Sequence, residues 1–544
     1  MSSQGDSRLF HGGPIVTMDD GAPAPEAVVT KADKIHFVGL LEEARTLARP
    51  DVTEVDLAGR TLLPGLIDAH SHILWAAKTR GAPVVDVRAE TVPTYKALLA
   101  KIRRRVAAAK PGEHLIFFGL DAQLHPDMEQ PTRAQLDELA PDNPIGIQTS
   151  NCHALFMNSR GFEACGINER TETPTGSIIE RDETGRPSGK IAEAITWRAL
   201  EVFYDAWGDD RLSEEFHASI GDFIQNGITT VTEHLYLPHY KAYYLSALKQ
   251  GLPMPRVAAY QQAVTADMQV EKLNIGDDRL WMAGVKIHAD GSPFIGNIWL
   301  SEPYLETAIT LERMDLKPGH TGSLNYPQDY FEKMARTYFG QGWRMSIHTQ
   351  GDRTIDMVLD LVEDILTKTP RADHRFRLEH CALMRKDQIE RAQKLGVLCS
   401  FFINHITHWG APIEDALFGP ERAAHYMPAG SALDAGMRIS LHADTPMTDP
   451  SCLELMKAAT TRLAGDGRCL GESERLDSLS ALKAVTIDAA YQIGMEDRLG
   501  SIKAGKHADL VILERNPLET PHLELANIGI AATYLAGECV WTNA

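Results

Sequence analysis

Short runs in which apolar and polar residues alternate occupy both ends of the 544-residue chain. Within residues 8–60, the segments RLFHGGPIVTMD, EAVVTKADKIHFVG and VTEVDLAGR show the period of two that is typical of β-strands. The segments HADLVILERNP and GIAATYLAGECVW return to this pattern near the C-terminus. Because chain termini often lie close together, these distant segments are predicted to form one sheet system.

Between these ends, short β-like runs alternate with helical stretches. Eight such runs follow one another: TLLPGLIDAH, GITTVTEH, RVAAYQQA, MAGVKIHADG, WRMSIHTQGD, RFRLEHCA, GVLCSFFINH and MRISLHADT. Strands and helices that alternate at this count predict an α/β protein built on a (β/α)8 barrel.

The connection after the first run is much longer than the others, since it extends from His72 to Gly227. Loops beyond about 15 residues usually cover a site or carry structure of their own. Residues near 75–205 are therefore predicted to form a lid over the barrel mouth. YKALLAKIRRRVAAAK and TRAQLDELA predict helices in this insertion, and TETPTGSIIERDETGRPSG predicts a loop-rich part. The predicted division is 1–60 for a β domain, 61–480 for the barrel with its insertion, and 481–544 for a helix and the rest of the β domain.

Composition narrows the class of protein. The chain is 44% hydrophobic and 24% charged, as ordinary globular proteins are. Its net charge of −20 argues against nucleic acid or an anionic membrane surface as a partner. The seven cysteines form no C-x-x-C pair, which fits a reducing compartment and disfavours a disulfide framework. The segment MSSQGDSRLFHGGPIVTMDD has no signal-peptide pattern and no apolar stretch is long enough to span a bilayer. We expect a cytoplasmic protein, and a homo-oligomer stays open.

Polar residues recur at the C-terminal ends of the eight runs, the face where such barrels keep their catalytic groups. They are His70, His72, Lys286, His348, His380 and Asp444. In the first run, two histidines are one residue apart, and strand side chains with that spacing project from the same face. A lone strand-end histidine is usually a hydrogen-bonded core residue. Four histidines, a lysine and an aspartate at matched strand ends predict a metal site.

Each residue type has a chemical reason to be present. Neutral imidazole binds zinc-like ions, and an H-x-H pair supplies two donors from one element. A lysine ammonium repels cations, but a neutral lysine amine can add carbon dioxide to give a carbamate whose two oxygens can bridge two ions. The Asp444 carboxylate can bind a metal through one oxygen and take a proton from metal-bound water through the other.

The segments PGLIDAHSH, VKIHADGS, IHTQGDRTID, RLEHC and LHADTP resemble the successive barrel-strand signatures of the amidohydrolase superfamily (amidohydrolase family 3). They are most similar to the branch that contains N-substituted formamide deformylase. NCHALFMNS and the ending ALKAVTIDAAYQIGMEDRLGSIKAGKHADLVIL also resemble this family, so the resemblance covers almost the whole chain. It implies a distorted (β/α)8 TIM barrel with a small β-sandwich domain built from both termini and a large insertion after barrel strand 1. It also implies metal and catalytic roles for His70, His72, Lys286, His348, His380 and Asp444.

Further residues are candidate substrate contacts: His153, Trp197, His288, His405, His408 and Trp409. His288 departs from the family pattern, which has an apolar or aromatic residue there. His405 and His408 could equally belong to a plain loop, and His153 and Trp197 could serve the structure of the insertion. Asp352 is expected to cap the following helix, and Asp290 to shape a loop. Phe401, Phe402 and Trp409 favour an apolar or aromatic substrate portion.

These observations predict a metal-dependent amidohydrolase that cleaves a C–N bond (amide, N-acyl, N-formyl or cyclic amide) of a small molecule by a metal-bridged hydroxide. Asp444 is the expected catalytic base. The expected cofactors are two divalent ions bridged by carbamylated Lys286; histidine donors suit zinc, and also nickel, copper and iron.

Two alternatives stay open. A mononuclear-metal deaminase of a heterocyclic amidine would leave Lys286 unmodified and use a carboxylic acid as proton donor. Glu379 is adjacent to His380, but on a strand it points away from it. A non-catalytic scaffold derived from such an enzyme would normally lack ligands. Glu233 and His234, at the end of the second run, match no metal position of the family.

Overall fold

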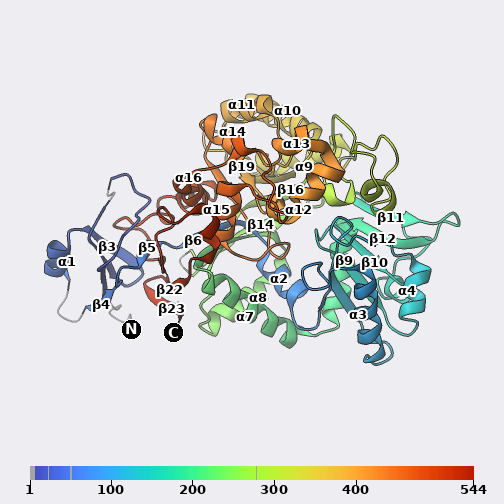
Figure 1. The fold of residues 1–544 in the computed structure, drawn as a ribbon, viewed down its shortest axis with the longest axis horizontal. Helices are drawn as coiled ribbons and strands as arrows, with labels where there is room; N and C mark the ends of the chain where they lie inside the picture. Colours follow the sequence, from blue (N-terminus) through green and yellow to red (C-terminus); the bar gives the residue numbers. More distant parts are fainter. Residues whose placement is uncertain (1–6, 22–23, 49–51, 277, 544) are drawn as a thin grey trace.

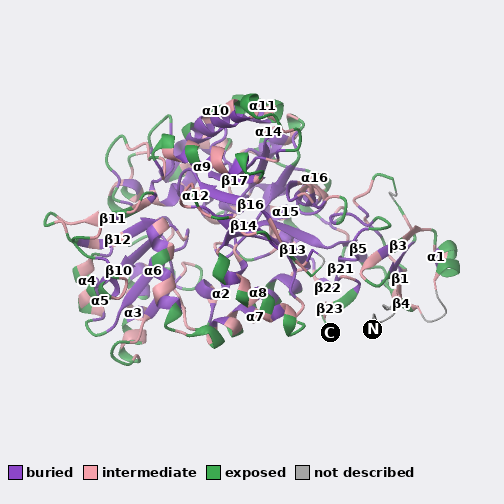
Figure 2. Ribbon diagram, turned by 180° about the vertical axis from the view of Figure 1, so that it is seen from behind, coloured by how far each residue is buried: buried purple, intermediate pink, exposed green. Residues whose placement is uncertain are grey.

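The computed structural model describes residues 7–21, 24–48, 52–276 and 278–543. A small β domain lies at one end, the barrel in the middle and the insertion at the other end (Figure 1). Buried residues follow the barrel strands and the insertion sheet, and exposed ones gather on the outer helices and loops (Figure 2). In the described part of the chain, no helix combines the length and apolar character needed to cross a membrane.

Eight parallel strands form a nearly closed barrel. They are β6 (Leu66–Ser71), β13 (Ile228–Tyr236), β14 (Arg256–Gln262), β16 (Leu280–His288), β17 (Met345–Thr349), β18 (Arg377–His380), β19 (Leu398–Phe401) and β20 (Ile439–Leu441). Ladder hydrogen bonds join these strands in chain order from β6 to β20. After β20, the Asp444 N–H donates to the His70 carbonyl of β6 at 3.0 Å. This hydrogen bond connects the last part of the barrel to the first strand. The predicted barrel is confirmed, with one barrel strand in each predicted run.

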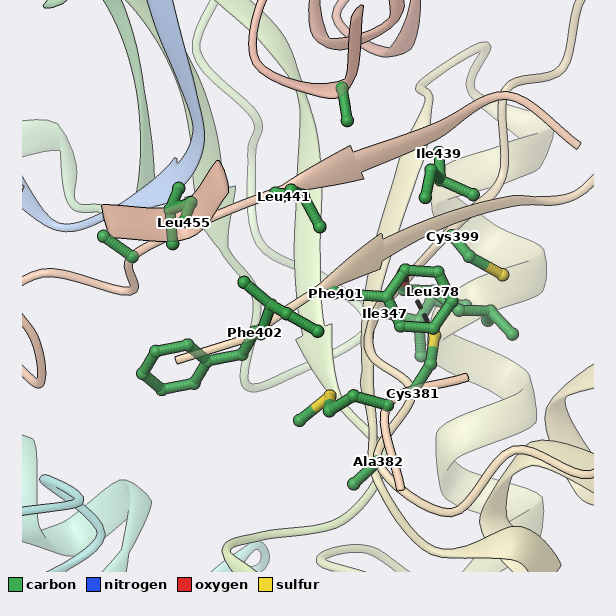
Figure 3. Close-up of a cluster of buried hydrophobic side chains, with 14 of the residues drawn as sticks. Ile347, Leu378, Cys381, Ala382, Cys399, Phe401, Phe402, Ile439, Leu441 and Leu455 are labelled. Carbon is green, nitrogen blue, oxygen red and sulfur yellow. Dashed lines mark hydrogen bonds between the residues drawn. The ribbon is translucent and has the colours of Figure 1, made fainter. Parts of the chain in front are cut away.

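Helices cover the outside of the barrel because each strand presents an apolar face to them. The ladder register places Ile347, Leu378, Cys399 and Ile439 side by side, and Figure 3 shows them in one apolar cluster. The covering helices include α7 (Asp209–Gln225), α8 (Lys241–Lys249), α9 (Gln328–Gly340), α10 (Asp352–Lys368), α11 (Lys386–Leu395), α16 (Ser478–Ala484) and α17 (Ile487–Gln492). Other helices come after β6, β19 or β20 in the chain: α2 (Ile73–Arg80), α12 (His405–Pro412), α13 (Gly419–Ala424), α14 (Ala429–Asp434) and α15 (Cys452–Thr461).

Strands from both ends of the chain form the small β domain. One sheet has β1 (Ser7–His11), β2 (Ala27–Lys31), β3 (Lys34–Gly39) and β4 (Thr53–Asp56), with α1 (Leu41–Leu47) beside it. The other has β5 (Thr61–Pro64), β21 (Leu510–Leu513), β22 (Ile530–Leu535) and β23 (Glu538–Thr542). Phe10 and Val28 of the first sheet pack with Leu62 and Leu510 of the second in one buried cluster. The predicted β-sandwich from both termini is therefore confirmed.

The run TLLPGLIDAH was expected to be one strand, and the structure divides it. β5 pairs antiparallel with β21, and β6 pairs parallel with β13. Gly65 lies between them at a point of close approach, since a Cβ atom there would lie 2.0 Å from Oγ1 of Thr229. The chain thus passes from sandwich to barrel at a residue where only glycine fits.

The insertion has a sheet of its own. Its six strands are β7 (Val85–Asp86), β8 (Leu115–Leu120), β9 (Ile145–Thr149), β10 (Ala154–Met157), β11 (Ser177–Arg181) and β12 (Pro187–Glu193). Its helices are α3 (Tyr95–Ala107), α4 (Arg133–Leu139), α5 (Ser159–Ala164) and α6 (Ala194–Asp205). Ile116 and Phe117 of β8 belong to different apolar clusters, so this sheet is covered on both faces. The two predicted helices are present, but the predicted loop TETPTGSIIERDETGRPSG contains the antiparallel pair β11 and β12.

Candidate metal centre

A cavity lies where the carboxyl ends of the barrel strands meet the insertion. The barrel lines it with His70, His72, His288, His348, His380 and Asp444. The insertion lines it with Asn151, Cys152, His153 and Trp197. Five of the six residues predicted to hold metal therefore share one cavity, and Lys286 lies fully buried behind this lining.

His70, His72 and Asp444 converge at the gap between the first and last barrel strands. The Nε2 atoms of His70 and His72 lie 3.5 and 3.1 Å from the same Asp444 carboxylate oxygen. Potential ligand atoms of the three residues lie within 4.8 Å of one another, as a shared ion requires. β6 ends at Ser71, so His72 lies beyond the strand, directly before α2. The H-x-H pair converges although only His70 is on the strand.

The two histidines of this pair differ in protonation. Burial, with His234 and Lys286 nearby, holds the pKa of His70 well below its ordinary value, so this imidazole is neutral and able to bind metal. Burial also acts to lower the pKa of His72, but the Asp444 and Glu233 carboxylates outweigh it and raise that pKa to about 9. His72 and Asp444 therefore form an ion pair, and a metal cation bound by both would take the place of that proton.

His348 lies near the end of β17, with its orientation fixed by a carboxylate. Its Nδ1 lies 3.0 Å from Asp290, which also accepts hydrogen bonds from the N–H groups of Gln350 and Gly351. Such a contact at Nδ1 leaves Nε2 free to face a metal. Sequence reasoning expected Asp290 to shape a loop, and the structure adds this contact to His348.

His380 reaches the cavity through an unusual backbone conformation. Its φ of 73° is left-handed and the following residue, Cys381, has φ 54°. Strict strand alternation would send Glu379 and His380 to opposite faces, and this turn lets His380 line the cavity while Glu379 stays inside the barrel. The His380 ring lies 4.5 Å from that of His348, and its Nδ1 lies 3.0 Å from Nε2 of His442.

Lys286 is the one predicted ligand that does not reach the cavity as an unmodified amine. It lies on β16 with no exposed surface, and its Nζ has no hydrogen-bond partner among the described residues. Burial lowers its pKa to about 8, against the opposing charges of Glu379 and Asp444. A buried amine without a partner, and with a neutral form within reach at physiological pH, fits carbamate formation.

A buried polar network supports the metal-binding side chains from inside the barrel. Glu379 accepts a hydrogen bond from Nδ1 of His70 at 2.7 Å. It also forms an ion pair with Arg377, and the side chains of Glu379 and Arg377 are almost fully buried. Arg377 donates to the Ala69 carbonyl at 3.0 Å, and the His234 ring stacks on His70 at 3.9 Å. Sequence reasoning missed these roles of Glu379 and His234. The i, i+2 spacing in RLEH was the available signal, because it puts Arg377 and Glu379 on one strand face.

The insertion brings His153 and Trp197 to the metal-binding side chains. The His153 ring lies 5.4 Å from the His348 ring, and the Trp197 ring lies 4.9 Å from the His288 ring. His288 thus lies between barrel and insertion, with its Nδ1 buried and without a partner in the described structure. Asn151 and Cys152 also line this wall, and sequence reasoning did not single them out.

The structure does not bring His405, His408 or Trp409 into the cavity lining. The Trp409 indole donates to Asp121 of the insertion at 2.9 Å, and His405 lies 3.0 Å from the Tyr426 hydroxyl. His408 is half-buried, 3.7 Å from Glu90. These residues support the insertion and the barrel mouth. Phe401 and Phe402 are buried in the apolar cluster of Figure 3, so their expected link to an aromatic substrate portion was wrong.

Comparisons with known proteins find similar chains along almost the whole sequence. The family described as "Amidohydrolase family" matches residues 53–541. The chain is 30% identical to N-substituted formamide deformylase of Arthrobacter pascens, over 96% of each chain. It is 24% identical to putative amidohydrolase YtcJ of Bacillus subtilis, over 98% of this chain and 99% of that protein. A solved metal-dependent hydrolase from Pyrococcus horikoshii shares the fold with a TM-score of 0.72 at 22% identity, over 95% of this chain and 99% of that one.

Proposed function

The chain belongs to the amidohydrolase family, and we propose that it hydrolyses an amide of a small molecule with two divalent ions at the barrel mouth. Members of this family act on C–N bonds other than peptide bonds, and the fold is that of metal-dependent hydrolases. The observation that carries the two-ion proposal is the convergence of His70, His72, His348, His380 and Asp444 on one cavity with the unpaired Lys286 amine behind it.

The ligands divide into two sets around Lys286. His70, His72 and Asp444 would hold one ion, since their potential ligand atoms lie within 4.8 Å of one another. His348 and His380, whose rings are 4.5 Å apart, would hold the other. A carbamate on Lys286 would supply the bridging oxygens. Histidine donors make zinc the proposed metal. When bound, the ions supply Lewis acidity that polarises the amide carbonyl and makes the attacking water acidic at neutral pH.

The chain's own groups move the proton. Asp444 lies at the edge of the cavity with one carboxylate oxygen near both His70 and His72. Burial would raise its pKa, but its hydrogen bond to His72 and the charge of that imidazolium hold the pKa below its ordinary value. Asp444 is therefore ionised and can take the proton of the attacking water at one carboxylate oxygen. It then passes this proton to the nitrogen of the departing amine.

An N-acyl or N-formyl amide is the proposed substrate class. The similarity to a protein named N-substituted formamide deformylase supports it. His153, Trp197 and His288 are the proposed substrate contacts. The cysteine pattern makes the cytoplasm the proposed location.

Metal analysis combined with a substrate panel tests this function. Protein purified from medium supplemented with zinc and bicarbonate should contain two ions per chain and release amine from N-formyl or N-acyl amides. One ion per chain, with ammonia released from a cyclic amidine, would favour the deaminase. No bound ion and no turnover would favour the scaffold. In the structure, the Glu379 carboxylate that a deaminase could use as proton donor is occupied by His70 and Arg377.

A further inference from the structure

One carboxylate of the insertion is buried beside the cavity and is not explained by the metal site. Glu193 is 1% exposed and lies at the end of β12, directly before α6. Its φ of 64° is left-handed, a conformation that a non-glycine residue keeps only where its surroundings fix it. Its side chain does not cap the helix. The carboxylate instead reaches toward His153.

Three side chains donate hydrogen bonds to the Glu193 carboxylate. His153 donates from Nδ1 at 3.0 Å, Asn297 from Nδ2 at 2.8 Å and Asn325 from Nδ2 at 3.0 Å. Burial alone would raise the pKa of Glu193, but His153 and Asn297 hold that pKa below its ordinary value, so the group is a carboxylate. A Cβ atom at Gly291 would lie 2.1 Å from Oε1 of Glu193, so the barrel loop also leaves space for this carboxylate.

These contacts give His153 a defined orientation. The Glu193 N–H also donates to the His153 carbonyl at 2.9 Å, so backbone and side chain of the two residues are joined. Because a carboxylate can only accept, this contact places the proton of a neutral His153 ring on Nδ1 and leaves Nε2 as an acceptor. His153 lines the cavity, 5.4 Å from the His348 ring, so this acceptor belongs to the wall that faces the metal-binding side chains.

The chemistry of an amide indicates what such an acceptor binds. With the carbonyl oxygen directed to the metal-binding residues, the one hydrogen-bond donor of a secondary amide is the N–H of the bond to be broken. A tertiary amide has no such donor and would leave the acceptor unpaired. A site built to bond a polar group rejects the analogue that lacks it more strongly than an apolar pocket rejects a change of size.

We infer that His153 accepts a hydrogen bond from the N–H of the scissile amide, that Glu193 is the residue that positions it, and that the enzyme is therefore selective for N-monosubstituted amides. The inference rests on the proposed function. It assigns the insertion a defined role in substrate choice, through a glutamate 40 positions away in sequence from the histidine that it orients.

The test compares a secondary amide that the wild-type enzyme hydrolyses with its N-methyl derivative. Wild type should prefer the N–H amide by at least about a hundredfold in kcat/KM. Glu193→Gln keeps the side-chain shape but lets the new amide donate to Nδ1, so Nε2 carries the proton and loses its role as acceptor. This variant should reduce the preference about tenfold or more without loss of bound metal. His153→Leu, which removes the acceptor altogether, should do the same.

Asp121→Asn is the matched control, because Asp121 is a buried carboxylate of the insertion that accepts from Ser150 and Trp409 away from the cavity lining. It should leave the preference unchanged. Equal hydrolysis of both amides by wild type, or an unchanged preference in His153→Leu, would overturn the inference and leave the proposed function standing. Failure to hydrolyse any amide, with or without the N–H, would overturn both.

Discussion

The barrel and the insertion each supply part of one cavity, but they hold their side chains in different ways. In the barrel, ladder register fixes the heights of the groups: His288 pairs with His348, and His348 with Glu379, on neighbouring strands. In the insertion, side-chain hydrogen bonds fix the position of a cavity-lining group, as Glu193 fixes the orientation of His153. A backbone ladder fixes where a barrel side chain begins, and partners such as Asp290 then orient it, whereas the position of His153 depends mainly on its contacts with one residue, Glu193. The barrel is therefore suited to the chemistry, and the insertion to substrate choice.

Buried polar contacts dock the insertion on the barrel. Lys78 of α2 donates to both carboxylate oxygens of Glu201 on α6, at 2.7 and 2.6 Å. The Lys78 ammonium also lies 4.5 Å from the centre of the Tyr240 ring. At the other side of the mouth, Gln123 donates to the Phe294 carbonyl at 3.1 Å. Side chains of the insertion are thus held in place over the site, as a wall for the substrate requires.

The largest effect is expected at the Lys286 amine. Lys286→Ala removes the group that would carry the bridging carbamate, so metal content should fall and kcat/KM should drop about a thousandfold or more, in line with the several kcal/mol that metal catalysis supplies. Metal analysis and steady-state kinetics measure both. Small carboxylates added to this variant should restore part of each, and Lys286→Arg should not be rescued, because guanidinium keeps its charge. Full metal content with wild-type turnover in Lys286→Ala would contradict the proposed bridge.

A smaller effect, confined to turnover, is expected at Asp444. Asp444→Asn should keep most of the bound metal, since the other ligands remain, and lose at least about a hundredfold in kcat, as removal of a general base commonly does. Asp352→Asn is the control, because Asp352 is a buried aspartate outside the cavity that bonds Ser301 and Arg385. Near wild-type kcat in a metal-replete Asp444→Asn protein would remove Asp444 from the proton transfer.

The smallest effect is expected in the insertion wall. Trp197→Ala removes apolar surface from the cavity and should raise KM about three- to tenfold, with metal content and melting temperature nearly unchanged. Trp207→Ala is the matched control, since Trp207 lies beyond the end of the same helix and packs on Tyr204 instead. Loss of metal in Trp197→Ala would contradict the proposal that the barrel binds the metal and the insertion contacts the substrate.

The barrel could be predicted from sequence because its strands are short apolar runs that end in polar residues. VKIH, SIHT and RLEH each pass from apolar to polar residues within a few positions. Most of the candidate ligands were identified as the polar residues at such strand ends. The insertion sheet was harder to recognise. Its strands β11 and β12 are rich in turn-forming and charged residues. They are strands because they pair with each other and because β12 also pairs with β10.

Roles that depend on distant partners could not be predicted. Nothing local to Glu379 shows that it accepts from His70, which is far away in sequence. The left-handed turn at His380 is likewise a product of tertiary packing, since its neighbour Cys381 donates to the Thr349 carbonyl of the adjoining strand at 2.9 Å. Phe401 and Phe402 illustrate the opposite error, because aromatic side chains near a site are more often part of the core than of the pocket.

The bend at Gly65 also sets an order of events during synthesis. β5 leads directly into the strand that carries His70, yet its ladder pairs Pro64 with Leu510. On the ribosome, β5 emerges together with Ile15, which forms a bridge with Leu62, but its ladder partner β21 is made much later. Pairing across so large a separation in sequence is slow and comes late in folding. The sheet that β5 shares with β21 can therefore form only after residues 510–513 have been synthesised, later than all the candidate ligands.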